Sequence, residues 1–160
     1  MLVPFAKEPD AINFGDLPPR INALLQKGVA AYRTDLASAD ALFREALELA
    51  PEELPTYFCL YKIHTYQGNL DEARRIAEIG LVESARQAGL PQDWRLWSPR
   101  PGLLDGAARF ALYTLKALAF IHLRRDEKTE SLSMLERLAE LDPTGAVGWP
   151  VVADLAAGVA

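Results

Sequence analysis

An internal repeat is the feature that most constrains what this chain can fold into. Residues 57–81 align with residues 115–139, so that apolar or small side chains coincide along both halves and a polar turn falls in the same place. A third copy covers residues 21–51, and a truncated fourth begins near Ala146. A repeated unit of this size buries its apolar face against its neighbours, so the sequence predicts a stack of similar units.

Each copy is predicted to be a pair of amphipathic helices joined by a short polar turn. Ser38 is expected to cap one helix, and Pro51 and Pro143 are expected to end two others. No window alternates with period two for long enough to form a sheet, so the predicted fold class is all-α, an antiparallel helix-pair solenoid. The expected first helices are 20–34, 55–67 and 106–125, the second helices are 38–50, 70–88 and 129–141, and a seventh near 151–157 covers the last pair.

Composition narrows the class of protein. The 160 residues are 50% hydrophobic, enough for a core without disulfides or metal, and a net charge of -5 argues against general nucleic-acid binding. A single cysteine, Cys59, excludes an intrachain disulfide, and Cys59, His64 and His122 are too scattered for a zinc site. Residues 1–10 lack the features of a secretory signal, and no apolar run is long enough to span a membrane, so we expect a cytoplasmic protein.

Several residues give the repeat a resemblance to a known family. Residues 66–73 are similar to the turn between the two helices of a tetratricopeptide repeat, which is a 34-residue helix pair. The small, aromatic, small and proline positions of its second half are matched by Ala39, Phe43, Ala46 and Pro51, and Trp149 lies where the next unit would carry its tryptophan. The resemblance implies a short right-handed solenoid over residues 20–160, with repeats at about 20–53, 54–88 and 106–143 and a cap at 146–160.

The chain departs from the family pattern at an insertion of roughly 24 residues between the second and third copies. Its prolines and glycines predict a loop over residues 89–105, which contains Trp94 and Trp97. We expect these tryptophans to fill the gap between the separated repeats, and the alternative is a secondary binding site on the loop. Residues 1–19 contain four prolines and are expected to form an extended arm that packs on the first pair, occupies a groove or is disordered.

The sequence contains no evident catalytic constellation. His64 and His122 occupy the same repeat position, which predicts packing histidines with satisfied hydrogen bonds. Cys59 lies among apolar residues and is expected to be inert. Because no paired carboxylates, activated nucleophile or glycine-rich phosphate loop stands out, we expect neither an enzyme nor a bound cofactor or metal. The rival hypothesis is an enzyme or cofactor binder that uses one of these three side chains.

The distribution of charge is the most informative functional signal. Segments 20–34, 54–68 and 106–125 contain no Asp or Glu, although the chain-wide frequency of 22 acids in 160 residues predicts about seven there. They keep eight Lys or Arg residues, and the family resemblance implies that first helices line the concave face of the solenoid. The positions expected to form a basic and aromatic groove are Tyr32, Arg33, Phe58, Lys62, Tyr66, Tyr113, Lys116, Phe120 and Arg124. The alternative is that the aromatic residues belong to the core and the cations only extend past them to solvent.

The predicted function is a protein–protein interaction module, an adaptor or chaperone-like protein that holds a partner segment with acidic and apolar residues. Small acidic three-repeat proteins of this length resemble type III secretion chaperones, and parts of the chain resemble short repeat proteins of bacterial nitrogen-fixation gene clusters. One family subgroup grips a terminal carboxylate with lysine and asparagine, but that clamp is absent because its positions hold Leu25, Val29, Cys59, Tyr113 and Ala117. The alternative is a structural homodimer or an assembly scaffold that makes no use of the groove.

Overall fold

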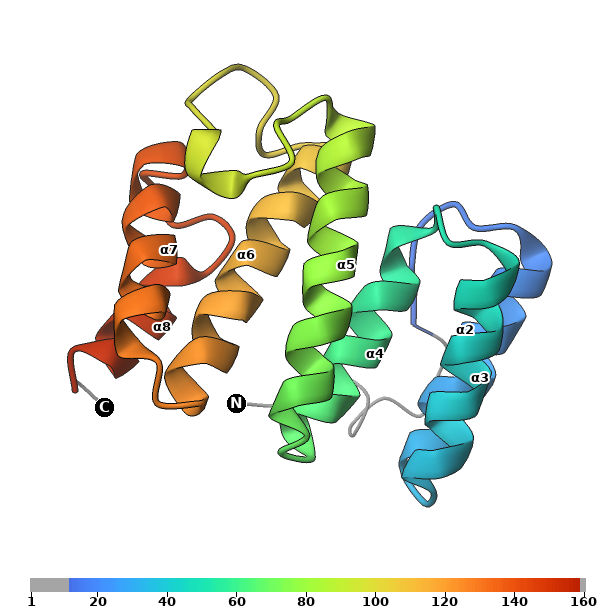
Figure 1. The fold of residues 1–160 in the computed structure, drawn as a ribbon. Coiled ribbons are helices and arrows are strands. Elements are labelled where there is room, and N and C mark those ends of the chain that lie inside the picture. The colour runs from blue at the N-terminus through green and yellow to red at the C-terminus, as the bar shows by residue number, and fades with distance from the viewer. Residues whose placement is uncertain (1–11, 159–160) are drawn as a thin grey trace. The chain divides into compact units, whose positions relative to one another are not determined.

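The structure, a computed structural model, describes residues 12–158. Every regular element in that range is a helix, which confirms the all-α prediction (Figure 1). The chain divides into two compact units, Met1–Asn69 and Leu70–Ala160, with the boundary in the turn inside the predicted second repeat. A single repeat domain over residues 20–160, and its solenoid arrangement, therefore remain predictions. The part of the expected N-terminal arm before Ile12 lies outside the described residues.

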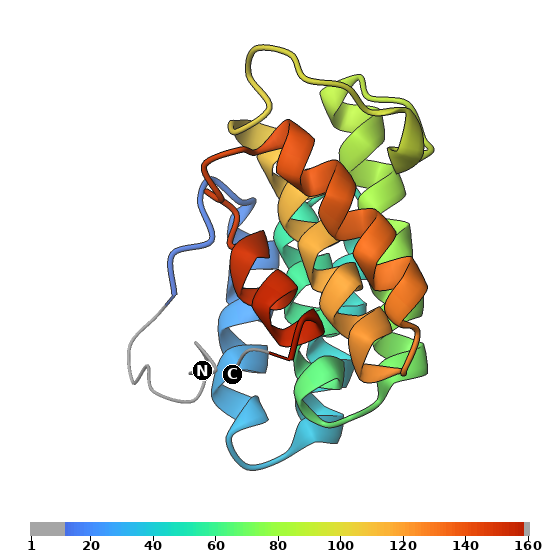
Figure 2. The same cartoon turned by 90° about the vertical axis from the view of Figure 1, so that its left-hand side faces the viewer.

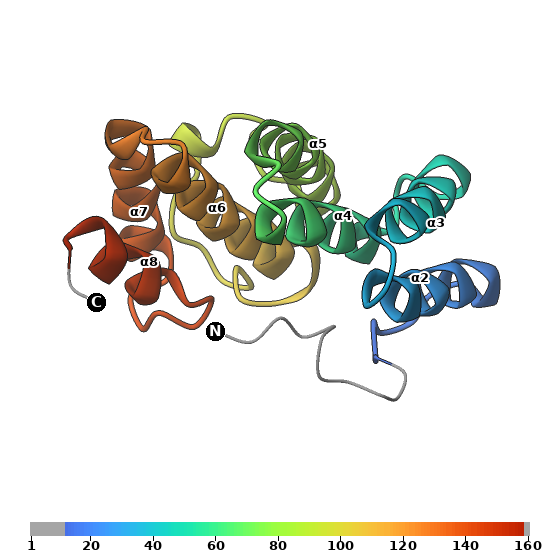
Figure 3. The ribbon, with the colours of Figure 1, turned by 90° about the horizontal axis from the view of Figure 1, so that it is seen from below.

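The first unit contains α2 (Pro19–Tyr32), α3 (Leu36–Leu49) and α4 (Leu54–Tyr66). Helix α3 packs against both α2 and α4, and α2 also contacts α4; Figure 3 shows α2 and α3 side by side. The approach of α2 to α3 depends on Gly28, because a Cβ there would lie 2.3 Å from Cε1 of the buried Phe43 ring. Ala39 and Ala46, which match the small positions of the repeat, are both fully buried.

The N-cap of α3 differs from the prediction by three residues. Asp35, not Ser38, is the N-cap: its Oδ1 accepts a hydrogen bond from the Ser38 backbone N–H at 3.2 Å, and its Oδ2 accepts one from the Ser38 hydroxyl at 2.6 Å. A carboxylate at this position satisfies an otherwise unpaired N–H and also interacts favourably with the helix dipole. The Asp35 backbone N–H donates to the Ala31 carbonyl at 2.8 Å, so a tight turn connects α2 to this cap.

The second unit contains α5 (Leu70–Ala88), α6 (Gly106–Arg124), α7 (Lys128–Leu141) and α8 (Trp149–Ala156). Helix α6 packs between α5 and α7, and α8 packs against both α7 and α6, as expected of a terminal helix that covers the last pair (Figure 2). The α7–α8 connection is organised by the buried Asp142, whose carboxylate accepts backbone hydrogen bonds from Ala146 and Val147. No helix among the described residues is both long and apolar enough to cross a membrane.

The loop between α5 and α6 contains a short 3₁₀ helix, Trp94–Leu96. Trp97 is 1% exposed and donates its indole N–H to the carbonyl of Pro91 at 2.7 Å, while Trp94 is 8% exposed. The prediction that these rings fill a gap between separated repeats is wrong in one respect, because α5 and α6 pack directly against each other and the loop lies across one end of the helices (Figure 1). Their burial fits a packing role rather than a surface binding site.

Candidate functional site

The nine residues predicted to form a groove lie on three helices. Two are at the C-terminal end of α2 and three are on α4, in the first unit, while four are on α6, in the second unit. All nine are half-buried or exposed, so none of the aromatic ones is a fully buried core residue. A continuous groove across both units remains a prediction. Within the first unit we define the α4 stripe as Phe58, Lys62 and Tyr66, and within the second the α6 stripe as Tyr113, Lys116, Phe120 and Arg124.

The α4 stripe follows from helical spacing, because residues four apart lie on the same face of a helix. The Lys62 ammonium lies 5.2 Å from the centre of the Phe58 ring and 5.4 Å from the centre of the Tyr66 ring. Both distances are within the range in which an aromatic face attracts a cation. The opposite face of α4 carries Leu60 and Ile63, which are fully buried. The stripe is thus the polar and aromatic side of a helix whose other side is core.

Lys62 is held in an unusual electrostatic environment for a lysine. Among the described residues, no carboxylate lies within 4 Å of its ammonium group. Burial lowers the pKa of Lys62, because removing water from around the ammonium group disfavours its charged form. The two aromatic rings offset only part of that cost, so an incoming carboxylate would find a partly desolvated cation already in position.

The α6 stripe repeats this chemistry in the second unit. The Lys116 ammonium lies 3.9 Å from the centre of the Tyr113 ring, and the Arg124 guanidinium lies 5.7 Å from the centre of the Phe120 ring. Burial raises the pKa of Tyr113, so this phenol stays protonated and can donate a hydrogen bond at neutral pH. Each cation again lies over an aromatic face on the same helix, as on α4.

Two arginines on the acid-free segments, Arg20 and Arg125, lie outside both stripes and have acidic partners. Arg20 lies 3.8 Å from Glu45 of α3, and Arg125 forms ion pairs with Asp71 and with Glu127. These arginines join one helix to the next, whereas Lys62, Lys116 and Arg124 lie over aromatic rings. These contacts distinguish Arg20 and Arg125 from the three stripe cations, which the sequence alone does not.

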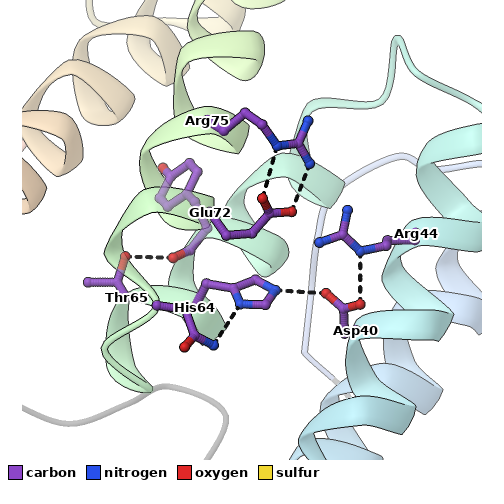
Figure 4. A network of polar contacts seen from close by, with 8 residues as sticks. Asp40, Arg44, His64, Thr65, Glu72 and Arg75 are labelled. Atoms are coloured by element: carbon purple, nitrogen blue, oxygen red, sulfur yellow. Dashed lines mark hydrogen bonds and ion pairs between the residues drawn. The ribbon is translucent and has the colours of Figure 1, made fainter.

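The two histidines hold helix ends in place. The His64 ring lies 2.7 Å from Asp40 of α3 through Nε2, and Nδ1 lies 3.2 Å from the side-chain amide of Asn69 (Figure 4). Because Asn69 donates to Nδ1, Nε2 carries the proton that Asp40 accepts. His122 uses the other nitrogen, Nδ1, which lies 2.7 Å from Glu127. Both imidazoles are less than 9% exposed, in agreement with the predicted packing role.

Asp40 is the carboxylate that connects α3 to the His64 ring. It accepts hydrogen bonds from Arg44 Nε at 2.8 Å and from His64, and Figure 4 shows it between the two side chains. Burial acts to raise the pKa of Asp40, but these hydrogen bonds outweigh it and hold the pKa below its ordinary value. Because this carboxylate stays ionised between two hydrogen-bond donors, it links α3 to α4 and has a structural role.

Cys59 and the metal-ligating residue types form no reactive arrangement among the described residues. Cys59 is fully buried on α4, and burial raises the pKa of its thiol far above the ordinary value, which keeps it protonated. Within residues 12–158, no group of three His, Cys, Asp or Glu side chains is close enough to hold a metal ion.

Sequence reasoning missed one polar pair on α2, Asn22 and Gln26. The Gln26 side-chain amide donates to the carbonyl of Ile12 at 2.6 Å and accepts from the Ile12 backbone N–H at 3.0 Å, and it also lies 3.1 Å from Asn22 Oδ1. Two amides four residues apart in a largely apolar helix are a signal that could have marked this face, but no charge or motif accompanies them.

Comparison of the chain with known protein families, with curated proteins and with solved structures gives no match. The resemblance to tetratricopeptide repeats therefore remains a prediction from the residues themselves, and a function has to be inferred from the geometry of the stripes.

Proposed function

We propose that this protein is a protein–protein interaction module that holds a partner segment carrying carboxylates and apolar side chains. The observation that carries the proposal is Lys62, a half-buried cation placed between two aromatic rings with no carboxylate partner among the described residues. A carboxylate of the partner would neutralise that charge where water is already partly excluded, and the rings would receive apolar side chains.

The α6 stripe supports the same ligand chemistry independently. It presents two cations and two aromatic rings along one face of α6, and the helix contains no acid that would repel an anionic segment. Cations of this kind contribute mainly specificity and association rate, whereas the aromatic side chains contribute most of the affinity. Each stripe would therefore bind an acidic residue next to an apolar one.

A binder is better supported than an enzyme by the engagement of the candidate reactive groups. His64 and His122 are each hydrogen-bonded to a carboxylate at a helix end, and Cys59 is a fully buried, protonated thiol. The proposal includes a cytoplasmic setting, which suits a chain whose single cysteine is unpaired and buried. An adaptor or chaperone-like role is its most direct form.

Selection of peptides from a random-sequence display library on the immobilised full chain tests this function even though the partner is unidentified. We expect the selected peptides to combine Asp or Glu with aromatic or aliphatic residues. Lys62→Glu together with Lys116→Glu should weaken binding of a selected peptide at least tenfold, or about 1.4 kcal/mol. Basic or uncharged selected sequences would contradict the proposed ligand chemistry.

The matched control is a second double reversal, Lys27→Glu with Lys128→Glu. Both lysines are exposed and lie outside the stripes, so the control changes the net charge by the same amount. It should bind the selected peptide within about threefold of the wild-type chain, because charges that far into solvent are screened. Equal losses in the two double variants would show that only net charge matters.

A further inference from the structure

The N-terminal segment that the structure describes is held on α2 by its backbone. Gln26 pairs with both the N–H and the carbonyl of Ile12, at 3.0 and 2.6 Å, and the neighbouring Asn22 accepts from the same Gln26 amide. This is the pair of hydrogen bonds that an adjacent strand would make to one residue. These two hydrogen bonds use no side-chain atom of Ile12, so a preference for an apolar segment has to come from the apolar contacts of its side chains.

Burial along this segment alternates. Ile12 and Phe14 are half-buried, whereas Asn13 and Gly15 are exposed, and no regular secondary structure is present from Ile12 to Gly15. Alternation with period two is the pattern of an extended chain with one side against a surface. The half-buried side chains of this segment are thus the apolar ones, Ile12 and Phe14, and the chain turns directly after them, where Asn13 Oδ1 accepts a hydrogen bond from the Gly15 N–H at 2.9 Å.

The receiving face of α2 includes one of the predicted groove positions. Asn22, Gln26, Val29 and Arg33 are spaced as residues i, i+4, i+7 and i+11, which places them along one stripe of the helix. The hydrogen bond between Gln26 and Asn22 agrees with this register. The segment at Ile12 thus pairs with the helix face that ends at Arg33.

We propose that Asn22 and Gln26 form a backbone-recognition site for an extended apolar segment, and that the chain's own Ile12–Phe14 occupies it until a partner segment displaces it. This inference rests on the proposed function and adds which segment occupies the α2 site when no partner is bound. The arm has the chemistry proposed for the ligand, since Asp16 follows the apolar pair and Phe5, Glu8 and Asp10 precede it in the sequence. An arm joined to α2 by a few residues has an effective concentration on the order of millimolar, so a partner must compete with it.

The test uses the full chain and a synthetic peptide of its residues 8–18 as the probe. In the double variant Ile12→Ala with Phe14→Ala, the attached arm loses its apolar contacts while the α2 site is unchanged. We expect the peptide to bind this variant at least tenfold more tightly than wild type, with saturable NMR shifts of the Gln26 side-chain amide. Equal binding to both chains would overturn the inference, provided that circular dichroism shows both to be folded.

Addition of Gln26→Leu to that double variant isolates the recognition site. We expect it to remove the gain in peptide affinity, because leucine fills a similar volume without the amide. The matched control is Gln87→Leu on α5, where the glutamine donates a hydrogen bond to Glu83 of its own helix. Peptide binding that survives Gln26→Leu, or is lost equally in Gln87→Leu, would overturn the backbone-recognition site.

The charge reversals separate this inference from the proposed function. If Lys62→Glu with Lys116→Glu leaves library-selected peptides bound while the arm peptide still depends on Gln26, the function of the stripes is wrong and the α2 site stands. If the reversals weaken binding of the selected peptides but binding of the arm peptide does not depend on Gln26, the proposed function of the stripes is supported and the displaced-arm inference is wrong.

Discussion

The turns after α4 and α6 close with the same backbone hydrogen bonds around different residues. After α4, Gly68 has φ 79° and Asn69 N–H donates to the His64 carbonyl at 2.8 Å. After α6, Asp126 has φ 64° in the equivalent place, and Glu127 N–H donates to the His122 carbonyl at 2.8 Å. Left-handed backbone is unfavourable for a non-glycine residue and not for glycine, so the second turn is the strained one.

Asp126→Gly should therefore stabilise the protein. Relief of the left-handed strain exceeds the entropy that glycine adds to the unfolded chain, for a net gain of about 0.5–1 kcal/mol. Urea denaturation with an unchanged m-value measures the effect. The matched variant is Gly68→Ala, which should cost about 1 kcal/mol; a loss of stability in Asp126→Gly would mean that the aspartate makes a compensating interaction.

Glu127 predicts a pH dependence at the same turn. Hydrogen bonds from Arg125 and then from His122 lower the pKa of its carboxyl from 4.5 to about 2. The folded state thus binds this proton more weakly than the unfolded state, so the contribution of Glu127 to stability is complete above pH 4.5 and is lost as the pH falls towards 2.

Glu127→Gln should flatten the loss of stability between pH 4.5 and 2, measured by thermal unfolding at a series of pH values. Glu136→Gln, at an exposed position of α7, is the control and should leave the curve as in wild type. An unchanged slope in Glu127→Gln would show that the carboxylate has no such linkage to folding.

At the scale of whole elements, the contact between α2 and α3 is set by one glycine. Alanine is the better helix former by about 1 kcal/mol, yet a Cβ on residue 28 would lie 2.3 Å from the ring of Phe43, which is fully buried in a close-packed interior. We expect Gly28→Ala to destabilise the protein by about 1–2 kcal/mol despite its helix propensity.

A double-mutant cycle with Phe43→Leu checks the cause of that loss. The smaller side chain should absorb the new methyl group, so the two changes should cost less together than the sum of each alone. Ala30→Gly, at an exposed position of α2, gives the propensity effect without a packing change. Additive costs would assign the loss to something other than the Phe43 contact.

Most helices could be predicted from the sequence because they carry an apolar periodicity and a recognisable end, whereas α4 is apolar on most sides and is marked mainly by Pro55 at its start and by the turn at Gly68. Pro51 and Pro143 follow helix ends as expected, and α5 begins and ends at the predicted residues. The N-cap of α3 could not be predicted from the sequence, because Asp35 and Ser38 are both good capping residues and only the turn geometry after α2 decides between them. The tryptophan loop is a loop as predicted, but its burial depends on packing that no local pattern encodes.

At the scale of the whole molecule, acidic residues are distributed unevenly along the chain, which the overall composition does not reveal. An acidic protein keeps Asp and Glu out of the three segments that contribute α2, α4 and α6, and the sequence shows this directly. The pairing of each cation with a ring on its own helix could be expected from spacing of three or four residues. The role of Asn22 and Gln26 on α2 could not be predicted from the sequence, because it depends on the Ile12 backbone to which Gln26 is hydrogen-bonded.

The role of the two stripes in binding is best tested by the salt dependence of affinity for one acidic peptide selected on the full chain. Fluorescence anisotropy would measure its Kd from about 20 to 500 mM salt, for wild type and for Lys62→Glu with Lys116→Glu. We expect binding to wild type to weaken steeply with salt, whereas the reversed variant should bind at least tenfold more weakly at low salt and show little or the opposite dependence. Identical affinities and identical salt slopes for the two chains would mean that the stripes do not bind the acidic segment.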